Sequence, residues 1–428
     1  MSINIPYSFI RLTILCILLV GLRLFIPLPF VGFLDEILMG CSLILILTHP
    51  LYLKRCKSVW CVLLIYLIYC ILNYFISPYS NSFYMMLLQS CITLKVFLVM
   101  VALFLSYTSL TKQQKTRITK IVKLTARVFV LIFFCSLVLN IILGTTWMNM
   151  WGLPIMYRNG MLRVFGMFNE GGANGYFIAF IVTTLLYFYL SAKLNLRNVF
   201  IIAVIAIALA YISSYRKTAL FCIPLFMIYN NNLNTQKRMI NIIFGGVLAL
   251  ILLYYMVGSA FFDDTFRDLS NFTNNDSNYI RGLLFYNGFW LAAHMFPFGT
   301  GAATFGSVYS QFNTLAVYRL VGMERWVLDF EEGAEVFDNY LGSIVAENGV
   351  IGMIIYIILI KKIYNLIITN IRIEYKPWFK IIYIYLLITS ILGPFICSAD
   401  GVIIFSMFLI YFLCKNETIS SVKYVSRR

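Results

Sequence analysis

The sequence predicts an all-α integral membrane protein. Hydrophobic residues make up 61% of the 428 residues and charged residues only 12%, so a water-soluble fold could not bury the apolar surface. Many windows of about 17 to 25 residues are almost free of charge, which is the length that an α-helix needs to cross about 30 Å of hydrocarbon. Backbone polar groups cannot be left unpaired in lipid, so we expect helices rather than open sheets.

We expect about twelve membrane-spanning helices, each long and apolar enough to cross the bilayer or come close to it. Their predicted ranges are 8 to 26, 33 to 48, 59 to 76, 84 to 107, 125 to 143, 174 to 191, 198 to 213, 218 to 229, 240 to 259, 339 to 360, 378 to 396 and 401 to 414. The eighth is short and is expected to be broken or re-entrant. The first lacks a small-residue cleavage site after its apolar core, so it is expected to be a retained span rather than a signal peptide.

The distribution of basic residues predicts the orientation. Lysine and arginine gather in alternate connections, which the positive-inside rule places in the cytoplasm together with both termini. These basic residues are Lys54, Arg55, Lys57, Lys112, Lys115, Arg117, Lys120, Lys123, Lys193, Arg197, Lys237, Arg238, Lys361, Lys362, Arg372, Lys376, Lys415, Lys423, Arg427 and Arg428. Of the 17 acidic residues, only Glu374 and Glu417 fall in segments placed inside. The net charge of +16 is therefore expected to lie mostly on the cytoplasmic face, where it contacts lipid headgroups, and nucleic-acid binding is excluded.

Cysteine and histidine usage gives no sign of a disulfide framework or a metal site. The ten cysteines lie in predicted spans or cytoplasmic connections, and none lies in a long outer loop. The two histidines, His49 and His294, are far apart in the sequence. We therefore expect neither a metal nor another cofactor.

Two outer connections are long, and they set the domain organisation. The predicted parts are residues 1 to 259 with the first nine spans and an outer loop at 144 to 173, a large outer loop at 260 to 338, the last three spans at 339 to 414, and a cytoplasmic tail at 415 to 428. Loops as long as the second are usually functional. It carries a helical pattern, "SNYIRGLLFYNGFWLAAHMF" (277 to 296), and then a glycine-rich turn, "PFGTGAATFG" (297 to 306). We expect a partly helical cap on the outer face.

Basic residues that break the positive-inside pattern point to an anionic ligand. They are Arg23, Arg158, Arg163, Arg216, Lys217, Arg267, Arg281, Arg319 and Arg325. Arginine offers a planar fork of donors that suits phosphate oxygens, so an outer cluster suggests a lipid headgroup or a diphosphate. Ion pairing within the loop is the alternative, and it is preferred for Arg267, which lies among Asp263, Asp264 and Asp268. For Arg163, Arg216 and Arg281 both interpretations stay open.

Lys95 lies near the middle of the fourth predicted span, within "QSCITLKVFLVM". A charge at that depth costs several kcal/mol unless it reaches water or a partner. The lysine is expected to line a hydrated cavity, to touch a lipid phosphate, or to extend toward either surface.

The stretch "EVFDNYLGSIVAENGVIGM" (335 to 353) resembles the end of the large periplasmic loop in the O-antigen ligase and polymerase superfamily. In that pattern a His and an Asn, Ser or Gln are followed by nine residues and then Gly-x-x-Gly; this chain has the same spacing but Asp338 in place of the histidine. Looser resemblances appear, in the family's order, in "RVFGMFNEGGANGYF" (163 to 177), "SSYRKTAL" (213 to 220) and "YIRGLLFYNGFWLAAHMFPFGTG" (279 to 301).

The aspartate favours an O-antigen polymerase of the Wzy type, because polymerases vary at this position. The resemblance implies a glycosyltransferase of lipopolysaccharide biosynthesis in the bacterial inner membrane, with undecaprenyl-diphosphate-linked oligosaccharide repeat units as substrates. The growing glycan would move to the non-reducing end of a new lipid-linked unit on the periplasmic face, and a chain-length regulator protein is a possible partner. An O-antigen ligase is the alternative. A lipid-linked oligosaccharide flippase is a second one, which predicts internal pseudo-symmetry that this chain lacks.

Glycosyl transfer from a diphosphate needs cations for the leaving group and a base for the attacking hydroxyl. The predicted diphosphate-binding residues are Arg158, Arg163, Arg216 and Arg281. Asp338 is the predicted base, Glu347 the second candidate and Glu170 a third, with helix capping as an equal alternative for Glu170. On a regular helix Asp338 and Glu347 would point in opposite directions, so only one should act. Asn339 would orient the acceptor or cap the tenth span.

Overall fold

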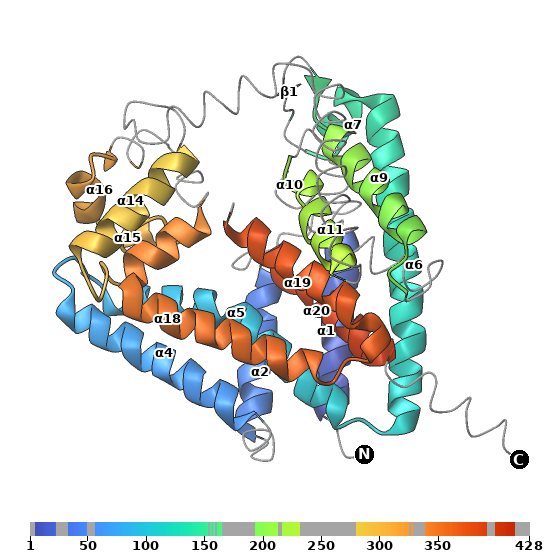
Figure 1. Cartoon of the computed structure of the whole chain (residues 1–428), viewed down its shortest axis with the longest axis horizontal. Helices are drawn as coiled ribbons and strands as arrows, with labels where there is room; N and C mark the ends of the chain where they lie inside the picture. Colours follow the sequence, from blue (N-terminus) through green and yellow to red (C-terminus); the bar gives the residue numbers. More distant parts are fainter. Residues whose placement is uncertain are drawn as a thin grey trace, which may run out of the picture.

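A computed structural model gives the arrangement of the chain (Figure 1). It describes residues 5–22, 33–48, 56–152, 155, 157–158, 161–164, 193–212, 216–231, 280–324, 327, 339–391 and 399–415. This part of the chain is mostly helical, as the sequence predicts. The two strands within it are two residues long each.

Within the described residues, three helices are long and apolar enough to cross a membrane: α4 (Lys57–Ile76), α5 (Phe83–Thr108) and α18 (Tyr340–Ile368). The predicted spans at 59 to 76 and 84 to 107 match the first two within two residues at each end. Helix α18 runs eight residues beyond the predicted end at 360, because Lys361 and Lys362 are good helix formers and stay exposed on its surface.

Most other predicted spans also coincide with helices. These are α1 (Ile5–Leu22), α2 (Leu34–Thr48), α6 (Lys112–Leu143), α9 (Leu196–Ile212), α19 (Lys376–Ile391) and α20 (Ala399–Lys415), with the short helix η4 (Ile373–Tyr375) before α19. The short eighth span is broken, as expected, into α10 (Arg216–Ala219) and α11 (Cys222–Asn230). The predicted spans at 174 to 191 and 240 to 259 lie outside the described residues.

Helix α6 begins 13 residues before the span predicted at 125. Its start is fixed by a capping box: the Thr111 hydroxyl accepts a hydrogen bond from the Gln114 backbone N–H at 3.4 Å, and the Gln114 side chain accepts one from the Thr111 N–H at 3.0 Å. The basic segment before the span is therefore helical rather than a loop.

Both long connections contain short elements. Residues 144 to 173 include α7 (Thr145–Met150) and an antiparallel pair of strands, β1 (Tyr157–Arg158) and β2 (Met161–Leu162). Residues 260 to 338 include α14 (Ile280–His294), α15 (Ser310–Asn313) and α16 (Ala316–Leu320). Helix α14 confirms the helical pattern predicted within 277 to 296.

Helix α5 lies at the centre of the packing. It contacts α1, α2, α4, α18 and α20, and every side chain from Thr93 to Tyr107 is buried. Figure 1 shows α14, α15 and α16 gathered beside the first turns of α18, with α4 along the length of α18. A second apolar cluster joins them, built from Leu283, Leu284, Phe305 and Tyr318.

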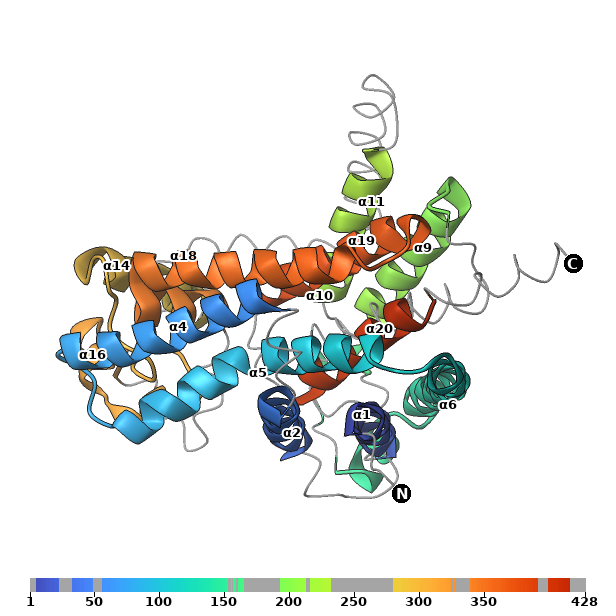
Figure 2. The same ribbon diagram turned by 90° about the horizontal axis from the view of Figure 1, so that it is seen from below.

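The helices do not all run in one direction. Figure 2 shows α4, α5 and α18 lying across the view, whereas α1, α2 and α6 are seen close to end-on. The number of helices that cross a membrane together therefore stays a prediction.

Candidate functional site

Helices α14 and α18 approach each other so closely that their backbones touch. A Cβ atom added to Gly288 would lie 2.4 Å from the carbonyl oxygen of Gly342, and one added to Gly342 would lie 2.4 Å from that of Leu284. Because carbonyl oxygens of two helices cannot move aside, only glycine fits at these crossings. Gly288 and Gly342 thus allow α14 to lie directly against the start of α18.

Asn339 ties these two helices together at their first turns. It is the N-cap of α18, since its Oδ1 accepts a hydrogen bond from the Gly342 N–H at 2.9 Å. Its Nδ2 donates to the carbonyl oxygen of Arg281 at 3.1 Å. The predicted capping role of Asn339 is confirmed, and the structure brings Asn339 and Arg281 side by side.

The expectation that Asp338 and Glu347 point in opposite directions rests on a premise that the structure corrects. Helix α18 begins at Tyr340, and Asn339 has extended backbone angles (φ −137°, ψ 94°). A regular helical rotation therefore does not connect the two carboxylates. Asp338 itself lies outside the described residues.

Helix α18 is kinked at Gly349, where φ is 57° and ψ is −163°. The interruption is compensated by the loop from Pro297 to Gly301. The Thr300 N–H donates to the Ala346 carbonyl at 2.8 Å and the Gly301 N–H to the Glu347 carbonyl at 2.9 Å. A buried backbone carbonyl that has lost its helical hydrogen bond destabilises the fold unless another donor reaches it. The kink therefore depends on the hydrogen bonds from this loop.

Helix α4 supplies side chains to the same place. The Asn73 amide donates to the carbonyl oxygens of Phe298 and Glu347, each at 2.9 Å. The Tyr69 hydroxyl donates to the Phe298 carbonyl at 2.8 Å, and the Tyr66 hydroxyl donates to the Asn348 side chain at 3.1 Å. Three separate segments therefore meet at the kink: α4, the 297–301 loop and α18.

The carboxylate of Glu347 lies in the centre of this junction, with the residue only 3% exposed. Its Oε1 accepts hydrogen bonds from the backbone N–H of Thr304 at 2.9 Å, from that of Phe305 at 3.2 Å, and from the Ser307 hydroxyl. We call these three donors the Glu347 nest. Such a buried, donor-filled oxygen is well suited to hold a loop, and the role of Glu347 as the second candidate base stays a prediction.

A short polar chain continues from the nest into the cap. The Tyr318 hydroxyl accepts a hydrogen bond from the Gly306 N–H at 2.7 Å and lies 2.7 Å from the Ser310 hydroxyl. Burial raises the pKa of Tyr318, so its hydroxyl stays protonated at neutral pH. The loop after Gly301 and helix α16 are therefore held to α18 by a connected network of neutral donors around the Glu347 carboxylate.

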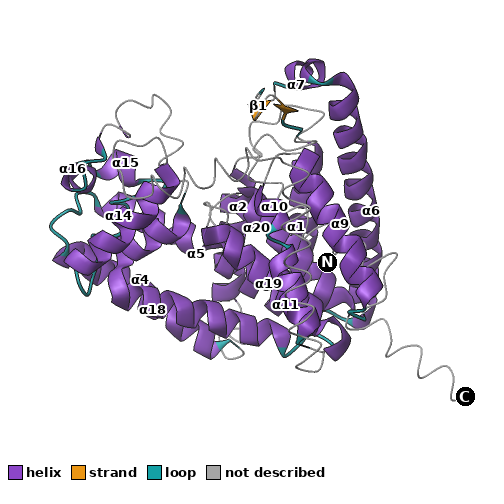
Figure 3. Ribbon diagram, turned by 45° about the horizontal axis from the view of Figure 1, so that its top comes forward, coloured by secondary structure: helices purple, strands orange, loops and turns teal. Residues whose placement is uncertain are grey.

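The predicted diphosphate-binding arginines fall into two groups. Arg281 is exposed on the first turn of α14, beside Asn339. Arg163 follows β2, and the next residue, Val164, donates its N–H to the Ile212 carbonyl at the end of α9. Arg158 in β1 and Arg216 at the start of α10 belong to the same group as Arg163, near the strand pair and the end of α9. Both are described by their backbone only. Figures 1 and 3 show β1 and α10 apart from α14.

Lys95 has a partner that sequence reasoning missed. Its ammonium group forms an ion pair with the Asp35 carboxylate, and the two side chains are 4% and 1% exposed. The Glu36 carboxylate, 45% exposed, lies 3.8 Å from the same nitrogen. Lys95 is thus neutralised within the helix packing rather than extended to a surface. Asp35 and Glu36 open the second predicted span, but their position in the sequence does not show that they meet Lys95.

Glu170 lies outside the described residues. Within the described residues no group of three or more His, Cys, Asp or Glu side chains is placed to hold a metal ion. No protein-family model matches this chain, and no curated protein matches it either.

Proposed function

We propose that this chain is a glycan polymerase of the O-antigen polymerase type, in the bacterial inner membrane. It joins oligosaccharide repeat units that are carried on undecaprenyl diphosphate. The three membrane-length helices and the further apolar helices support a multi-pass protein, which we place with about twelve spans, both termini in the cytoplasm and residues 260 to 338 in the periplasm.

The observation that carries the proposal is the contact between two motif elements quoted from separate parts of the sequence. Pro297-x-Gly299-x-Gly301 of the loop packs backbone to backbone on Gly349 of the Gly-x-x-Gly element. A Cβ atom on Gly299 would lie 2.4 Å from the Gly349 nitrogen, and one on Gly349 would lie 2.5 Å from the Gly299 nitrogen. Gly299 and Gly349, one from each motif element, thus share one physical role, which is to let the loop backbone lie directly on the kinked helix.

The first turns of α14 and α18 are the place where we put the chemistry. In the proposed step the acceptor hydroxyl oxygen attacks the anomeric carbon of the donor sugar, and the bond from that carbon to the carrier diphosphate breaks. The hydroxyl proton goes to the carboxylate of Asp338, which then releases it to water. Arg281, whose backbone carbonyl accepts the hydrogen bond from Asn339, would counter the charge that grows on the diphosphate.

The second arginine group suits a reaction with two lipid-linked substrates. A polymerase of this type binds a donor and an acceptor that both carry a diphosphate. Arg158, Arg163 and Arg216 lie by the strand pair, the end of α9 and the start of α10, away from α14 and Arg281 (Figure 1). We assign one arginine group to each carrier, which favours a polymerase over a flippase that carries one substrate at a time.

The glycan profile of a strain that lacks the chain tests this function. We expect core lipid capped by a single repeat unit, because units still form, cross and are ligated but are not joined. Full-length polymer that accumulates on the lipid carrier would indicate a ligase instead. Repeat units trapped on the cytoplasmic face would indicate a flippase. Restoration of the ladder by the unaltered chain is the control.

A further inference from the structure

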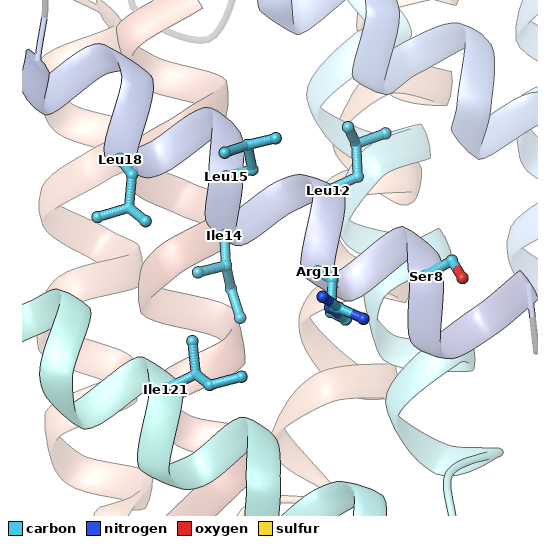
Figure 4. Close-up of a pocket in the computed structure, with 7 residues that line it drawn as sticks. All are labelled: Ser8, Arg11, Leu12, Ile14, Leu15, Leu18 and Ile121. Atoms are coloured by element: carbon cyan, nitrogen blue, oxygen red, sulfur yellow. The ribbon is translucent and has the colours of Figure 1, made fainter.

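A groove runs between helices α1 and α6. Its residues are far in the sequence from those of the site described above. It encloses about 420 Å³ and is lined by Ser8, Arg11, Leu12, Ile14, Leu15, Leu18 and Ile121 (Figure 4). This volume lies in the range of sites that hold small molecules. All but one of the lining residues come from α1.

The lining changes from polar to apolar along the groove. Ser8 and Arg11 stand toward the start of α1, whereas Leu15 and Leu18 stand one to two turns further along (Figure 4). Leu15 is 50% exposed, so its side chain is open to a ligand. A molecule with an anionic head and a hydrocarbon tail fits this order.

The charge at the polar end is available for such a head. Arg11 is exposed, and its guanidinium lies 5.7 Å from the centre of the Tyr7 ring. No carboxylate of the described residues pairs with Arg11. Ion pairs that involve described acids are formed instead by Lys95 and Arg319.

Helix α6 adds positive charge on the same side. Figure 1 shows that α1 and α6 both begin at the end of the molecule where the N-terminus lies. The first turns of α6 are basic, with Lys112, Lys115, Arg117, Lys120 and Lys123. Arg117 is exposed one turn before Ile121, so it lies on the same face of α6 toward the polar end of the groove.

We propose that this groove binds one anionic glycerophospholipid. Its phosphate contacts Arg11 and Ser8, and an acyl chain lies along Leu12, Leu15 and Leu18. The charge complementarity and the polar-to-apolar order select a lipid over a soluble phosphate, which would leave the leucines uncovered. This site is independent of the glycan chemistry proposed above, and it faces the side on which the basic connections lie.

Native mass spectrometry of the purified full chain, titrated with phosphatidylglycerol or phosphatidylcholine, tests the proposal. We expect phosphatidylglycerol to bind more tightly than phosphatidylcholine, and Arg11→Gln to weaken phosphatidylglycerol binding about fivefold, since one basic contact at a lipid surface is worth about 1 kcal/mol. Arg197→Gln, an exposed arginine at the start of α9, is the matched control and should bind as the unaltered chain does.

A second variant addresses the apolar end. Leu15→Trp should fill the groove and weaken phosphatidylglycerol binding, whereas Leu64→Trp, at a site 55% exposed on α4, should not. Equal binding of the two lipids, or unchanged binding in both Arg11→Gln and Leu15→Trp, would overturn the proposal. Melting temperatures of all variants establish that the compared chains are folded.

Discussion

The Oε1 oxygen of Glu347 accepts the backbone N–H of Thr304 at 2.9 Å, and this contact fixes the cap loop against the kinked helix α18. The same oxygen accepts the Phe305 N–H and the Ser307 hydroxyl. Glu347, the second candidate for the base, therefore also anchors the loop to α18.

Replacement of Glu347 by Ala should lower the free energy of unfolding by about 3 kcal/mol or more, because three buried donors lose their acceptor. Glu347→Gln keeps an acceptor and should cost less, about 1 to 2 kcal/mol, with polymer still formed. Thermal unfolding in detergent measures both. Glu324→Gln is the control, since its ion pair with Arg319 lies at the surface, with side chains 32% and 63% exposed, and contributes about 0 to 1 kcal/mol. Loss of polymer in Glu347→Gln at unchanged stability would show a catalytic role instead.

Gly349→Ala should prevent stable folding. The added Cβ would lie 2.5 Å from the Gly299 nitrogen and 2.6 Å from the Pro297 carbonyl oxygen, and the positive φ disfavours a side chain. Gly40→Ala in α2 is the matched control, because nothing lies within 4 Å of its Cβ position and alanine favours a helix by about 1 kcal/mol. Expression level and melting temperature compare the two. Equal stability of both variants would contradict the backbone contact at the kink.

Asp35 and Lys95 should show strong coupling in a double-mutant cycle. Lys95→Met alone leaves the buried Asp35 carboxylate without its partner and should cost about 3 to 5 kcal/mol, whereas Asp35→Asn should cost less because Glu36 lies 3.8 Å from the Lys95 nitrogen. The double variant should cost clearly less than the sum of the two. Denaturant unfolding provides the free energies. Additivity within about 0.5 kcal/mol would mean that the two side chains do not pair.

Two exposed positions should label from opposite sides of the membrane. Phe312 in α15 is 65% exposed and Ile373 in η4 is 83% exposed. In intact spheroplasts a membrane-impermeant maleimide should modify Phe312→Cys and spare Ile373→Cys until the membrane is opened. The unaltered chain gives the background from its native cysteines. Labelling of Phe312→Cys only after permeabilisation would place the cap in the cytoplasm and remove the basis of the proposed function.

Much of the helical framework could be predicted from the sequence because apolar length alone decides where a chain can cross lipid. The ends of α4 and α5 follow from this rule, and the pattern around Trp290 predicts α14. The sequence predicts two alternative roles for Asn339, and the helix-capping role is confirmed because its side chain accepts the Gly342 N–H within the same turn.

What the sequence could not supply is the choice of partners between distant segments. The spacing of charges does not reveal that Lys95 meets Asp35, 60 residues earlier in the chain. The kink at Gly349 is visible only once the 297–301 loop is seen to take its backbone hydrogen bonds. Likewise, the sequence does not show how far apart the four predicted diphosphate-binding arginines lie. They are expected as one cluster, and the fold separates them into two groups.

The most direct test of the central claim is the surface-glycan ladder of a strain in which Asp338→Asn replaces the native residue, at matched protein level. Asparagine keeps the size of the side chain but cannot take up the hydroxyl proton. We predict core lipid that carries single repeat units and no ladder. A ladder of normal length distribution would contradict the account, because the proposed proton acceptor would then be dispensable.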